Sequence, residues 1–590
     1  MGASMQNRFS LALALFVLLG AVGCGDDAAS PDTGPADSGS DTSTPDAGDA
    51  GDLDAGPPPY VIDGYCPGGT GCEAGPDGTL RVGVAKVDVT PVIDATTDIQ
   101  TVDVNGDGEF DPFAGDEFAD NNHNGVFDGV WIAGYGNPRA ASGVNDPQWI
   151  RAVAMQNGDV TLVIAAIDCV GYFDDEVRMI RQAVSDLGVD YLSVSATHSH
   201  ESRDTVGIWG LDETQTGLDP AYMALLRDKA EEVIRAAVAD MRPANIEYAS
   251  FRLRDKPGGM LRYVSDSRDP VIIDDEVRLL RFVDAGADTT IGTLINWAAH
   301  AEYSGSENQL LSSDVPYWLR QGVEEGVVDA DGTTLPGLGG IAVYVNGAVG
   351  GQIGPGRLQA QTWAGDDLPR HSRPTAMAVG EQVASFVLHA FDDGSGAVRD
   401  ETAALGYRAH SFLLDVQNRG YHVALLNRLF DRGTYDWDPD RPLVPGMNEP
   451  SIKTEVAVMD VGRAQLILVP GELDPALFIG GYDGSNTPAG TDIVDLSQTN
   501  PPDLSAAPAG PYVRDEARAD ADYVWLMGLT NDEVGYFVPD FDYQLDARNP
   551  YIDQAPGDHY EETNSVGVDA WPTVRGELSR LLGWTPGGGT

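Results

Sequence analysis

Two histidines separated by a single residue follow a short apolar run. The run is "VSAT", from Val194 to Thr197, and the histidines are His198 and His200. The run predicts a strand, and side chains in an extended segment repeat every two residues, so both imidazoles face the same side. Such a pair can bind a metal ion, usually zinc, which takes nitrogen ligands. Histidines at a strand end are about as often hydrogen-bonded polar groups, so the pair alone leaves both interpretations open.

Three further segments place a possible metal ligand after an apolar run or within a loop. "LINWAAH" ends in His300, and "LILVPGEL" contains Glu472, where a buried carboxylate without a partner would be costly. Tyr536 lies in "LTNDEVGYFVPD". With His198 these side chains could form a four-ligand zinc site with room for a water molecule. Sequence spacing does not establish that they converge.

Two nearby segments, 103–111 and 120–128, repeat oxygen-bearing side chains around a glycine. Their sequences are "DVNGDGEFD" and "DNNHNGVFD". A calcium loop needs this alternation, although Ala114 and Trp131 stand where an EF-hand has glutamate. We expect either structural calcium (Ca2+) loops, favoured by the two near-copies, or plain Asx-turn loops. The possible ligands are Asp103, Asn105, Asp107, Asp111, Asp120, Asn122, Asn124 and Asp128.

Alternating apolar runs and helical patterns must position these side chains. We predict strands at 160–170, 191–197, 289–300, 339–351 and 464–473, several of them buried on both faces. Helices are predicted at 174–188, 221–241 and 374–391. This alternation predicts an α/β (mixed α+β) fold, with one large catalytic domain of mixed sheets flanked by helices.

The N-terminal residues predict export. Arg8 precedes an apolar run from Phe9 to Val22, which is too short for a comfortable bilayer span and fits a signal peptide. The next residues, "AVGCGDD", resemble a bacterial lipobox and imply that Cys24 is lipidated; the alternative is an ordinary signal peptide with a chance cysteine. Residues 25–58 are Asp, Ala, Ser, Thr, Gly and Pro almost throughout, which predicts a flexible linker.

The remaining cysteines predict a disulfide and a core position. Cys66 and Cys72 lie close together in a Gly-rich lead-in, residues 59–80, and in an exported protein we expect them to pair. Cys169 ends the buried-strand pattern "LVIAAIDCV" and is expected to be a small core residue rather than a nucleophile.

The charge balance excludes one class of partner. The chain has 36 Lys and Arg against 92 Asp and Glu, a net charge of −56. Nucleic acid would be repelled by such a surface. The acidic surface suits a salty or extracellular setting, and simple solubility explains it equally well.

The order of several motifs resembles the neutral/alkaline non-lysosomal ceramidase family. The resemblance extends from about residue 82 to 584, nearly the whole predicted domain. Its segments are "VGVAKVDVTP", "GYGNPRAASGVNDPQWIRAVAM", "VSATHSHESRDTVGIWG", "NWAAHAEYSG", "LSSDVP", "VPGEL", "NDEVGYFVP" and "HYEETNS".

The resemblance implies a zinc site. The first histidine of the Ala-Thr-His-x-His motif, here His198, would bind zinc (Zn2+). The histidine after the Asn-Trp strand is His300, the glutamate after the Pro-Gly turn is Glu472, and the tyrosine of the Gly-Tyr-x-Val segment is Tyr536. These three would complete the ligand set.

The resemblance also implies two catalytic residues. His200, the second histidine of the motif, would carry a proton to the leaving amine. Tyr560, in the Tyr-Glu segment, would donate a hydrogen bond to the carbonyl oxygen in the transition state. Activity on ceramide would place the protein in sphingolipid metabolism.

The chain departs from the family pattern around the substrate. The segment "NGAVGGQIGP" lacks the active-site serine of ceramidases. Asn145 replaces a histidine found in many relatives, and Ser202 and Arg203 replace a Gly-Pro pair. The family's C-terminal immunoglobulin-like domain is expected to be absent.

We therefore expect a signal peptide over residues 1–24, a linker over 25–58 and a zinc hydrolase domain over 81–590. The expected reaction is hydrolysis of the amide bond of an N-acyl, ceramide-like lipid by metal-activated water. The expected location is the cell envelope, on the outer membrane, in the periplasm or at the cell surface. The alternatives are a zinc esterase or deacylase acting on another acylated metabolite, and a non-catalytic ligand-binding lipoprotein. The sequence leaves the oligomeric state open.

Overall fold

The computed structural model of the protein describes residues 61–106, 110–111, 113–136, 139–212, 214–352, 357–392 and 394–586. The predicted signal peptide, Cys24 and the linker over 25–58 lie outside these residues, and so does Asp107. Among the described residues, no helix combines the length and the apolar character needed to cross a bilayer.

The larger sheet has nine strands. Eight of them follow the order β10-β9-β8-β2-β11-β12-β13-β17, and β18 pairs with β11 at the side. The pairs β10–β9 and β13–β17 are parallel and the others antiparallel. The strands are β2 (Arg81–Asp88), β8 (Trp149–Asn157), β9 (Val160–Ile167), β10 (Tyr191–Ala196), β11 (Arg242–Arg252), β12 (Glu276–Asp284), β13 (Thr290–Trp297), β17 (Ile341–Asn346) and β18 (Val398–Asp400).

The smaller main sheet has five strands in the order β1-β19-β20-β21-β23. Its last pair, β21–β23, is parallel, so both of these strands end at the same edge of the sheet. The strands are β1 (Gly64–Cys66), β19 (Leu405–Asp415), β20 (Ser451–Val461), β21 (Ala464–Leu468) and β23 (Tyr523–Met527).

The two main sheets share one hydrophobic core. It combines side chains of the nine-stranded sheet, such as Leu162 and Leu280, with Met459, Leu466 and Trp525 of the five-stranded sheet. Every residue of β9 and of β10 is buried. This burial explains their continuous apolar sequences, since a strand covered on both faces has no polar side to display.

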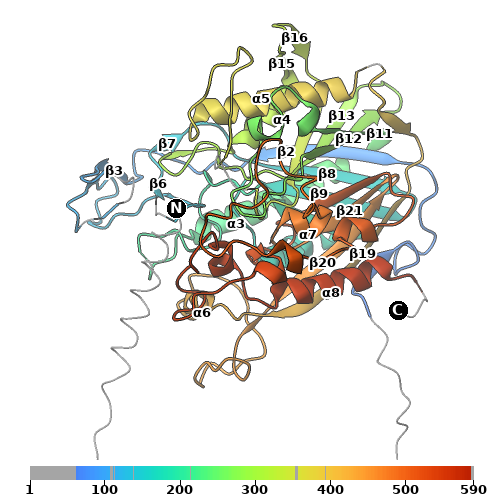
Figure 1. The fold of residues 1–590 in the computed structure, drawn as a ribbon. Helices are drawn as coiled ribbons and strands as arrows, with labels where there is room; N and C mark the ends of the chain where they lie inside the picture. Colours follow the sequence, from blue (N-terminus) through green and yellow to red (C-terminus); the bar gives the residue numbers. More distant parts are fainter. Residues whose placement is uncertain are drawn as a thin grey trace, which may run out of the picture.

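Helices cover the outer faces of this pair of sheets. Helices α2 (Asp174–Ala183) and α3 (Pro220–Ala239) pack on β8 and β9, and α4 (Val315–Glu325) and α5 (Arg373–Ala390) pack on β12, β13 and β17. Helix α8 (Ala570–Gly583) packs on β19 and β20 of the smaller sheet. Figure 1 shows α4 and α5 along one side of the molecule and α8 along the other, with the sheets between them. Two short helices, α6 (Arg419–Leu426) and α7 (Pro475–Ile479), complete the seven of the described residues.

Helix starts are set by side-chain caps. Asp219 accepts a hydrogen bond from Ala221 N at the start of α3, where Pro220 occupies the first turn. Ser372 does the same for Thr375 N at the start of α5. Both combinations satisfy backbone N–H groups that have no partner inside the helix.

Several two-stranded sheets and 3₁₀ turns occupy the connections. The pairs are β3 (Ile99–Val102) with β4 (Glu117–Ala119), β5 (Trp131–Ile132) with β6 (Arg139–Ala140), β7 (Gly143–Val144) with β14 (Leu310–Leu311), β15 (Gly326–Val328) with β16 (Thr334–Pro336), and β22 (Glu472–Leu473) with β24 (Tyr536–Phe537). The 3₁₀ turns cover Ser185–Leu187, Leu253–Asp255, Met260–Arg262, Leu504–Ala506, Val513–Glu516, Asp540–Asp542 and Glu561–Asn564.

The predicted mixed α/β fold is confirmed. The five predicted strands correspond to β9, β10, β13, β17 and β21, and the three predicted helices to α2, α3 and α5. The helix predicted to run to residue 188 ends earlier, at Ala183, and a 3₁₀ turn continues to Leu187 before Gly188 adopts a φ of 66°. The segment predicted as one strand over 464–473 is interrupted at Pro470, because proline has no N–H to donate to a ladder.

The cysteines agree with their predicted roles. Cys66 and Cys72 form a disulfide. Cys169 is a free thiol, and it is fully buried in the core beneath α2 and α3.

The Asp- and Asn-rich loops bond to their own backbone. Asp111 Oδ1 accepts from Phe113 N at 2.7 Å, Asn122 Oδ1 from Asn124 N at 3.1 Å, and Asn124 Oδ1 from Val126 N at 2.8 Å. These are the bonds of Asx turns, the second of the two predicted alternatives. Calcium binding at these loops stays a prediction.

A fully buried ion pair connects the end of β9 to helix α4. Arg320 donates two hydrogen bonds of 2.8 Å to the Asp168 carboxylate, and neither side chain is exposed. Burial alone would raise the pKa of Asp168, but Arg320 and Ser313 lower it below its ordinary value. This pair fixes the edge at which β9 and β10 end.

We predict that Arg320→Met lowers the free energy of unfolding by about 3–5 kcal/mol, because it leaves the Asp168 carboxylate buried without its counter-ion. Urea unfolding at neutral pH measures this loss. Because the pKa of Asp168 is lowered, the ion pair stabilises the protein at pH values above the ordinary pKa of a carboxyl group. This stabilisation is lost as the pH falls through the lowered pKa. The double variant Arg320→Met, Asp168→Leu should recover much of the loss, and a double variant as unstable as the single one would contradict this account.

Candidate metal centre

The predicted ligands follow the ends of parallel strands in both main sheets. His198 follows β10, and His300 follows β13. Glu472 and Tyr536 begin β22 and β24, which continue beyond β21 and β23 and pair in register, residue 472 opposite 536. Parallel strands bring their carboxyl ends to one edge, where α/β proteins commonly place their sites.

Curvature of the larger sheet brings the two histidine loops together. Strands β10 and β17 lie at opposite edges of its strand order, yet Asn346 at the end of β17 donates to Ala196 O of β10 at 3.3 Å. The loops beyond β10 and β13 then pair: Ser199 bridges to Ala301, and His200 N donates to Ala301 O at 2.9 Å. The sheet is therefore nearly closed where the ligands meet.

The four predicted ligands converge at one point. Glu472 Oε2 lies 2.9 Å from His300 Nε2 and 3.4 Å from His198 Nε2. The Tyr536 hydroxyl lies 3.5 Å from His300 Nε2. The structure thus brings together all four residues that the resemblance assigned to zinc.

Backbone carbonyls determine which histidine nitrogens face the centre. His198 Nδ1 lies 2.5 Å from Val170 O, and His300 Nδ1 lies 3.0 Å from Gln352 O. A carbonyl oxygen only accepts hydrogen bonds, so the proton of each neutral imidazole is on Nδ1 and the Nε2 lone pair points inward. The segment that lacks the family's serine therefore still contributes the Gln352 carbonyl behind His300.

When both imidazoles are neutral, His198 Nε2, His300 Nε2 and the Glu472 carboxylate all face the centre as acceptors. With both Nδ1 atoms protonated, each Nε2 faces Glu472 Oε2, and this buried oxygen has no hydrogen-bond partner among the described residues. Without a cation, burial lowers the pKa of His198 but Glu472 raises it to about 9, so a proton on His198 Nε2 would occupy this centre; the histidines in turn lower the pKa of Glu472. Both shifts show that the centre favours a positive charge. A metal cation fits this donor set.

His200 belongs to the same cluster. Its Nε2 lies 3.0 Å from His198 Nε2, and its Nδ1 lies 3.3 Å from Glu302 Oε2. The ligand nitrogens of His198, His200 and His300 all lie within 4.8 Å of one another, so the three could hold a metal ion. The position of His200 fits a proton carrier beside the metal and also a third imidazole ligand.

The loop around His200 requires a glycine and an arginine. An ideal Cβ at Gly134, whose φ is 108°, would lie 2.4 Å from His200 Cβ, so only glycine fits there. The buried Arg139 guanidinium donates to the His200 carbonyl and, at 2.8 Å, to Glu201. These contacts hold the imidazole in place from behind.

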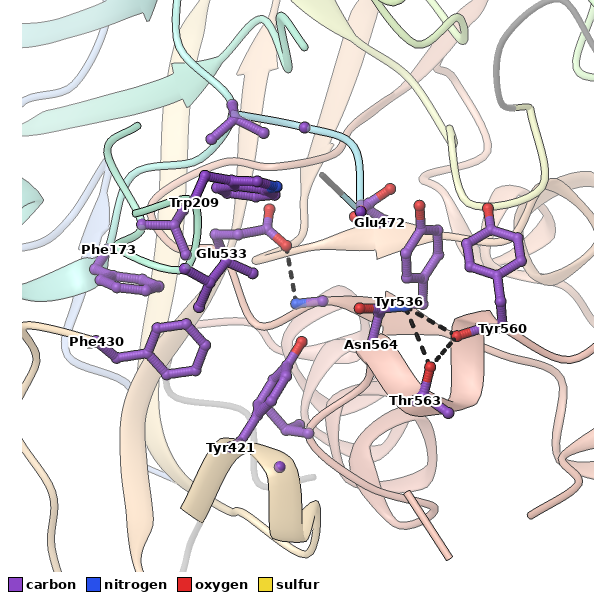
Figure 2. Close-up of a pocket in the computed structure, with 18 of the residues that line it drawn as sticks. Phe173, Trp209, Tyr421, Phe430, Glu472, Glu533, Tyr536, Tyr560, Thr563 and Asn564 are labelled. Carbon is purple, nitrogen blue, oxygen red and sulfur yellow. Dashed lines mark hydrogen bonds between the residues drawn. The ribbon is translucent and has the colours of Figure 1, made fainter. Parts of the chain in front are cut away.

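Tyr560 faces the same space from the C-terminal part of the chain. Its hydroxyl is buried and has no hydrogen-bond partner among the described residues, and its ring meets that of Tyr536 edge to face. Figure 2 shows the two rings side by side, with Thr563 and Asn564 bonded to Tyr560 below them. Behind this turn, the buried Arg268 pairs with Glu561 at 2.7 Å and with Glu562 at 3.0 Å.

A cavity of about 230 Å³ adjoins the metal centre. Its lining combines polar side chains, among them His198, His200, Glu302, Glu472 and Glu533, with a larger apolar set. Figure 2 shows Phe173, Trp209, Tyr421 and Phe430 grouped on the side away from Tyr536 and Tyr560. The apolar set comprises Val170, Phe173, Val206, Ile208, Trp209, Val416, Tyr421, Leu425, Phe430, Ile452, Ile552 and Val566.

Sequence reasoning missed two acidic residues of the cavity. Glu302 lies two residues after His300, and Glu533 lies three residues before Tyr536. In the sequence, only their nearness to a predicted ligand pointed to them. An acidic residue in a loop is usually solvated, so its residue type alone indicates no role. His559, the neighbour of Tyr560 in sequence, does not line the cavity; its Nδ1 lies 3.1 Å from Glu562.

Comparisons with known proteins agree with this architecture. No family model matches the chain, and no curated protein matches it significantly. The crystal structure of neutral ceramidase from Pseudomonas aeruginosa has a TM-score of 0.55 and 14% sequence identity, over 85% of this chain and 74% of that one. A structure described as ceramidase complexed with C2 gives a TM-score of 0.53 and 13% identity, over 85% and 75% of the two chains. The chain has the neutral ceramidase fold. The fold implied by the sequence motifs is thereby confirmed.

We predict that a divalent metal stabilises the protein against unfolding, because it relieves the mutual repulsion of the inward-facing acceptors. A metal at about 100 times its dissociation constant should add about 2.7 kcal/mol. Thermal unfolding with zinc and with a chelator measures the difference. His300→Ala should reduce the metal-dependent increment, whereas His389→Ala, at an exposed histidine paired with Asp329, should retain it. Equal unfolding temperatures with and without metal would contradict the assignment.

Proposed function

We propose that the protein is a zinc-dependent hydrolase that cleaves the amide bond of an N-acyl, lipid-like substrate. The observation that supports this most is the centre of His198, His300 and Glu472 beside a largely apolar cavity. Nitrogen and carboxylate donors suit zinc, and a catalytic site leaves room beside the ion. The ceramidase fold gives independent support for a hydrolase of acylated lipids.

The residues that would hold the ion are His198, His300, Glu472 and Tyr536. A bound zinc ion supplies Lewis acidity, which activates water at neutral pH and polarises an acyl carbonyl. The chain itself positions the donors, through the Val170 and Gln352 carbonyls behind the two imidazoles. The apolar lining of the cavity would bind the apolar part of the substrate and exclude bulk water.

His200 is placed to move a proton. Glu302 Oε2 lies 3.3 Å from His200 Nδ1, although the two atoms form no hydrogen bond. His200 Nε2 lies 3.0 Å from His198 Nε2, beside the position of the proposed ion, where it would accept a proton from water and pass it to the leaving amine. Tyr560 would act on the carbonyl oxygen, because its buried hydroxyl lines the cavity with a donor to spare.

Two alternatives remain in the proposal. A zinc esterase or deacylase acting on another acylated metabolite would use the same centre, and the altered segments around 145, 202–203 and 346–355 leave the acyl donor open. A binding lipoprotein would keep the fold without turnover. We further propose that the protein is exported and held at a membrane through Cys24, which would place it beside lipid substrates.

We predict that His198→Ala lowers the rate of amide hydrolysis at least about 10³-fold, because it deletes a ligand of the metal ion that would activate water. Initial rates on matched N-acyl and O-acyl substrates, together with metal content, measure the effect. His389→Ala is the control and should leave both rates unchanged. Faster turnover of the ester than of the amide by the wild-type protein would favour the esterase, and a wild-type protein without bound metal or turnover would favour the binding lipoprotein.

We predict that Tyr560→Phe lowers kcat by about 10²–10³ with a much smaller effect on KM, as expected for a donor that acts in the transition state. The phenyl ring preserves the edge-to-face contact with Tyr536, so the fold and the metal content should not change. Steady-state kinetics on an amide substrate test this. An unchanged kcat would rule out a catalytic role for the hydroxyl.

A further inference from the structure

A second carboxylate, that of Glu533, lies near the proposed metal ligands. Glu533 belongs to the loop that connects β23 to β24 and lines the cavity three residues before Tyr536. Single ligand atoms of Glu533, Glu472 and His198 all lie within 4.8 Å of one another. Figure 2 shows the Glu533 side chain between the aromatic group of the cavity and Glu472.

One oxygen of this carboxylate has no hydrogen-bond partner. Oε1 accepts from Gly535 N at 2.9 Å, whereas Oε2 is buried and unpartnered among the described residues. The neighbouring Glu472 Oε2 is buried and unpartnered in the same way. Two buried carboxylates this close are unfavourable when both are ionised: without a cation, burial and Glu472 raise the pKa of Glu533, and a cation between them would allow both to be ionised.

The protein holds Glu533 in this position through several contacts. An ideal Cβ at Gly171 would lie 2.7 Å from Glu533 Cγ, so the glycine makes room for the side chain. Arg432 donates to the Glu533 carbonyl at 3.3 Å and pairs with Asp532 at 2.8 Å. The guanidinium is thereby engaged by the backbone and by Asp532, and Glu533 keeps its free oxygen.

The lone pair of His198 limits the number of ions. Its Nδ1 is bonded to Val170 O, which leaves Nε2 as the only nitrogen available to a metal. The group of three histidines and the group of His198, Glu472 and Glu533 both need that nitrogen. They therefore describe one ion position with a larger donor set, because one lone pair binds one ion.

We propose that Glu533 is a ligand of the metal ion, so that the centre has two carboxylates. The inference rests on the proposed metal site and extends it beyond His198, His300, Glu472 and Tyr536. Two carboxylates neutralise a divalent ion, so the centre has little attraction for anions. A donor set richer in carboxylate oxygen also suits metals that accept more than four ligands.

The test compares wild-type protein with Glu533→Gln, which keeps the shape and removes the charge, and with Glu533→Asp, which keeps the charge and shortens the reach. Zn2+ and Co2+ affinity are measured by calorimetry on protein stripped with a chelator, and the bound Co2+ is examined by its visible absorption spectrum. His389→Ala is the control, because its exposed side chain pairs with Asp329 and Asp392 and does not line the cavity.

We expect one ion per chain in the wild type, and at least about a tenfold loss of affinity in Glu533→Gln with a changed Co2+ spectrum. The unfolding temperature of metal-free Glu533→Gln should be equal to or above that of the metal-free wild type, because a buried charge is removed. If Glu533 had only a structural role, the substitution would lower the unfolding temperature of the metal-free protein.

Unchanged affinity and an unchanged spectrum in Glu533→Gln would overturn the proposal. So would two ions per wild-type chain, since that result requires a second ion position. A wild type that binds metal while Glu533→Gln binds it equally well refutes only the role of Glu533. A wild type that binds no metal refutes the metal centre itself, so the two failures are distinguishable.

Discussion

The site depends on a set of buried acceptor atoms that face one another around a position suited to a cation. His198 Nε2, His300 Nε2 and Glu472 Oε2 meet within hydrogen-bonding distances, while backbone carbonyls hold both imidazole protons on the far side. In a low-dielectric interior this arrangement is costly by itself and favourable around a cation. The protein therefore holds a position that favours a cation electrostatically before any substrate binds.

A few buried arginines hold the segments that carry these acceptors in place. The chain has 36 basic residues against 92 acidic ones, and several of its arginines lie behind the site rather than on the surface. Arg139 holds the His200 loop, Arg268 the turn after Tyr560, Arg320 the end of β9, and Arg432 the loop of Glu533. Each guanidinium satisfies carboxylates or carbonyls that would otherwise be buried alone, and its planar fork fits bidentate contacts.

The cavity combines this charged centre with an aromatic wall. Phe173, Trp209, Tyr421 and Phe430 lie on one side, and the metal centre with Tyr560 lies on the other. This division suits a substrate with an apolar part and one polar, reacting group, because each end meets a surface of its own kind. The chain departs from the ceramidase motifs at positions 145, 202–203 and 346–355 and keeps those that carry the proposed metal ligands. The chemistry is therefore better defined than the substrate.

The sequence by itself determined the elements and the types of side chain at their ends. The continuous apolar runs of β9 and β10 require burial on both faces, and Pro220 with Asp219 marks the start of a helix, since these effects are local. Tertiary structure alone decided that His198 and His300 meet, because the larger sheet must curl until β10 and β17 approach, and no local pattern encodes that curvature. It also decided the environment of Glu533: an acidic loop residue is ordinary in sequence, and only packing buries its Oε2 without a donor. Local propensities act over a few residues, whereas the convergence of side chains hundreds of residues apart depends on how whole sheets pack.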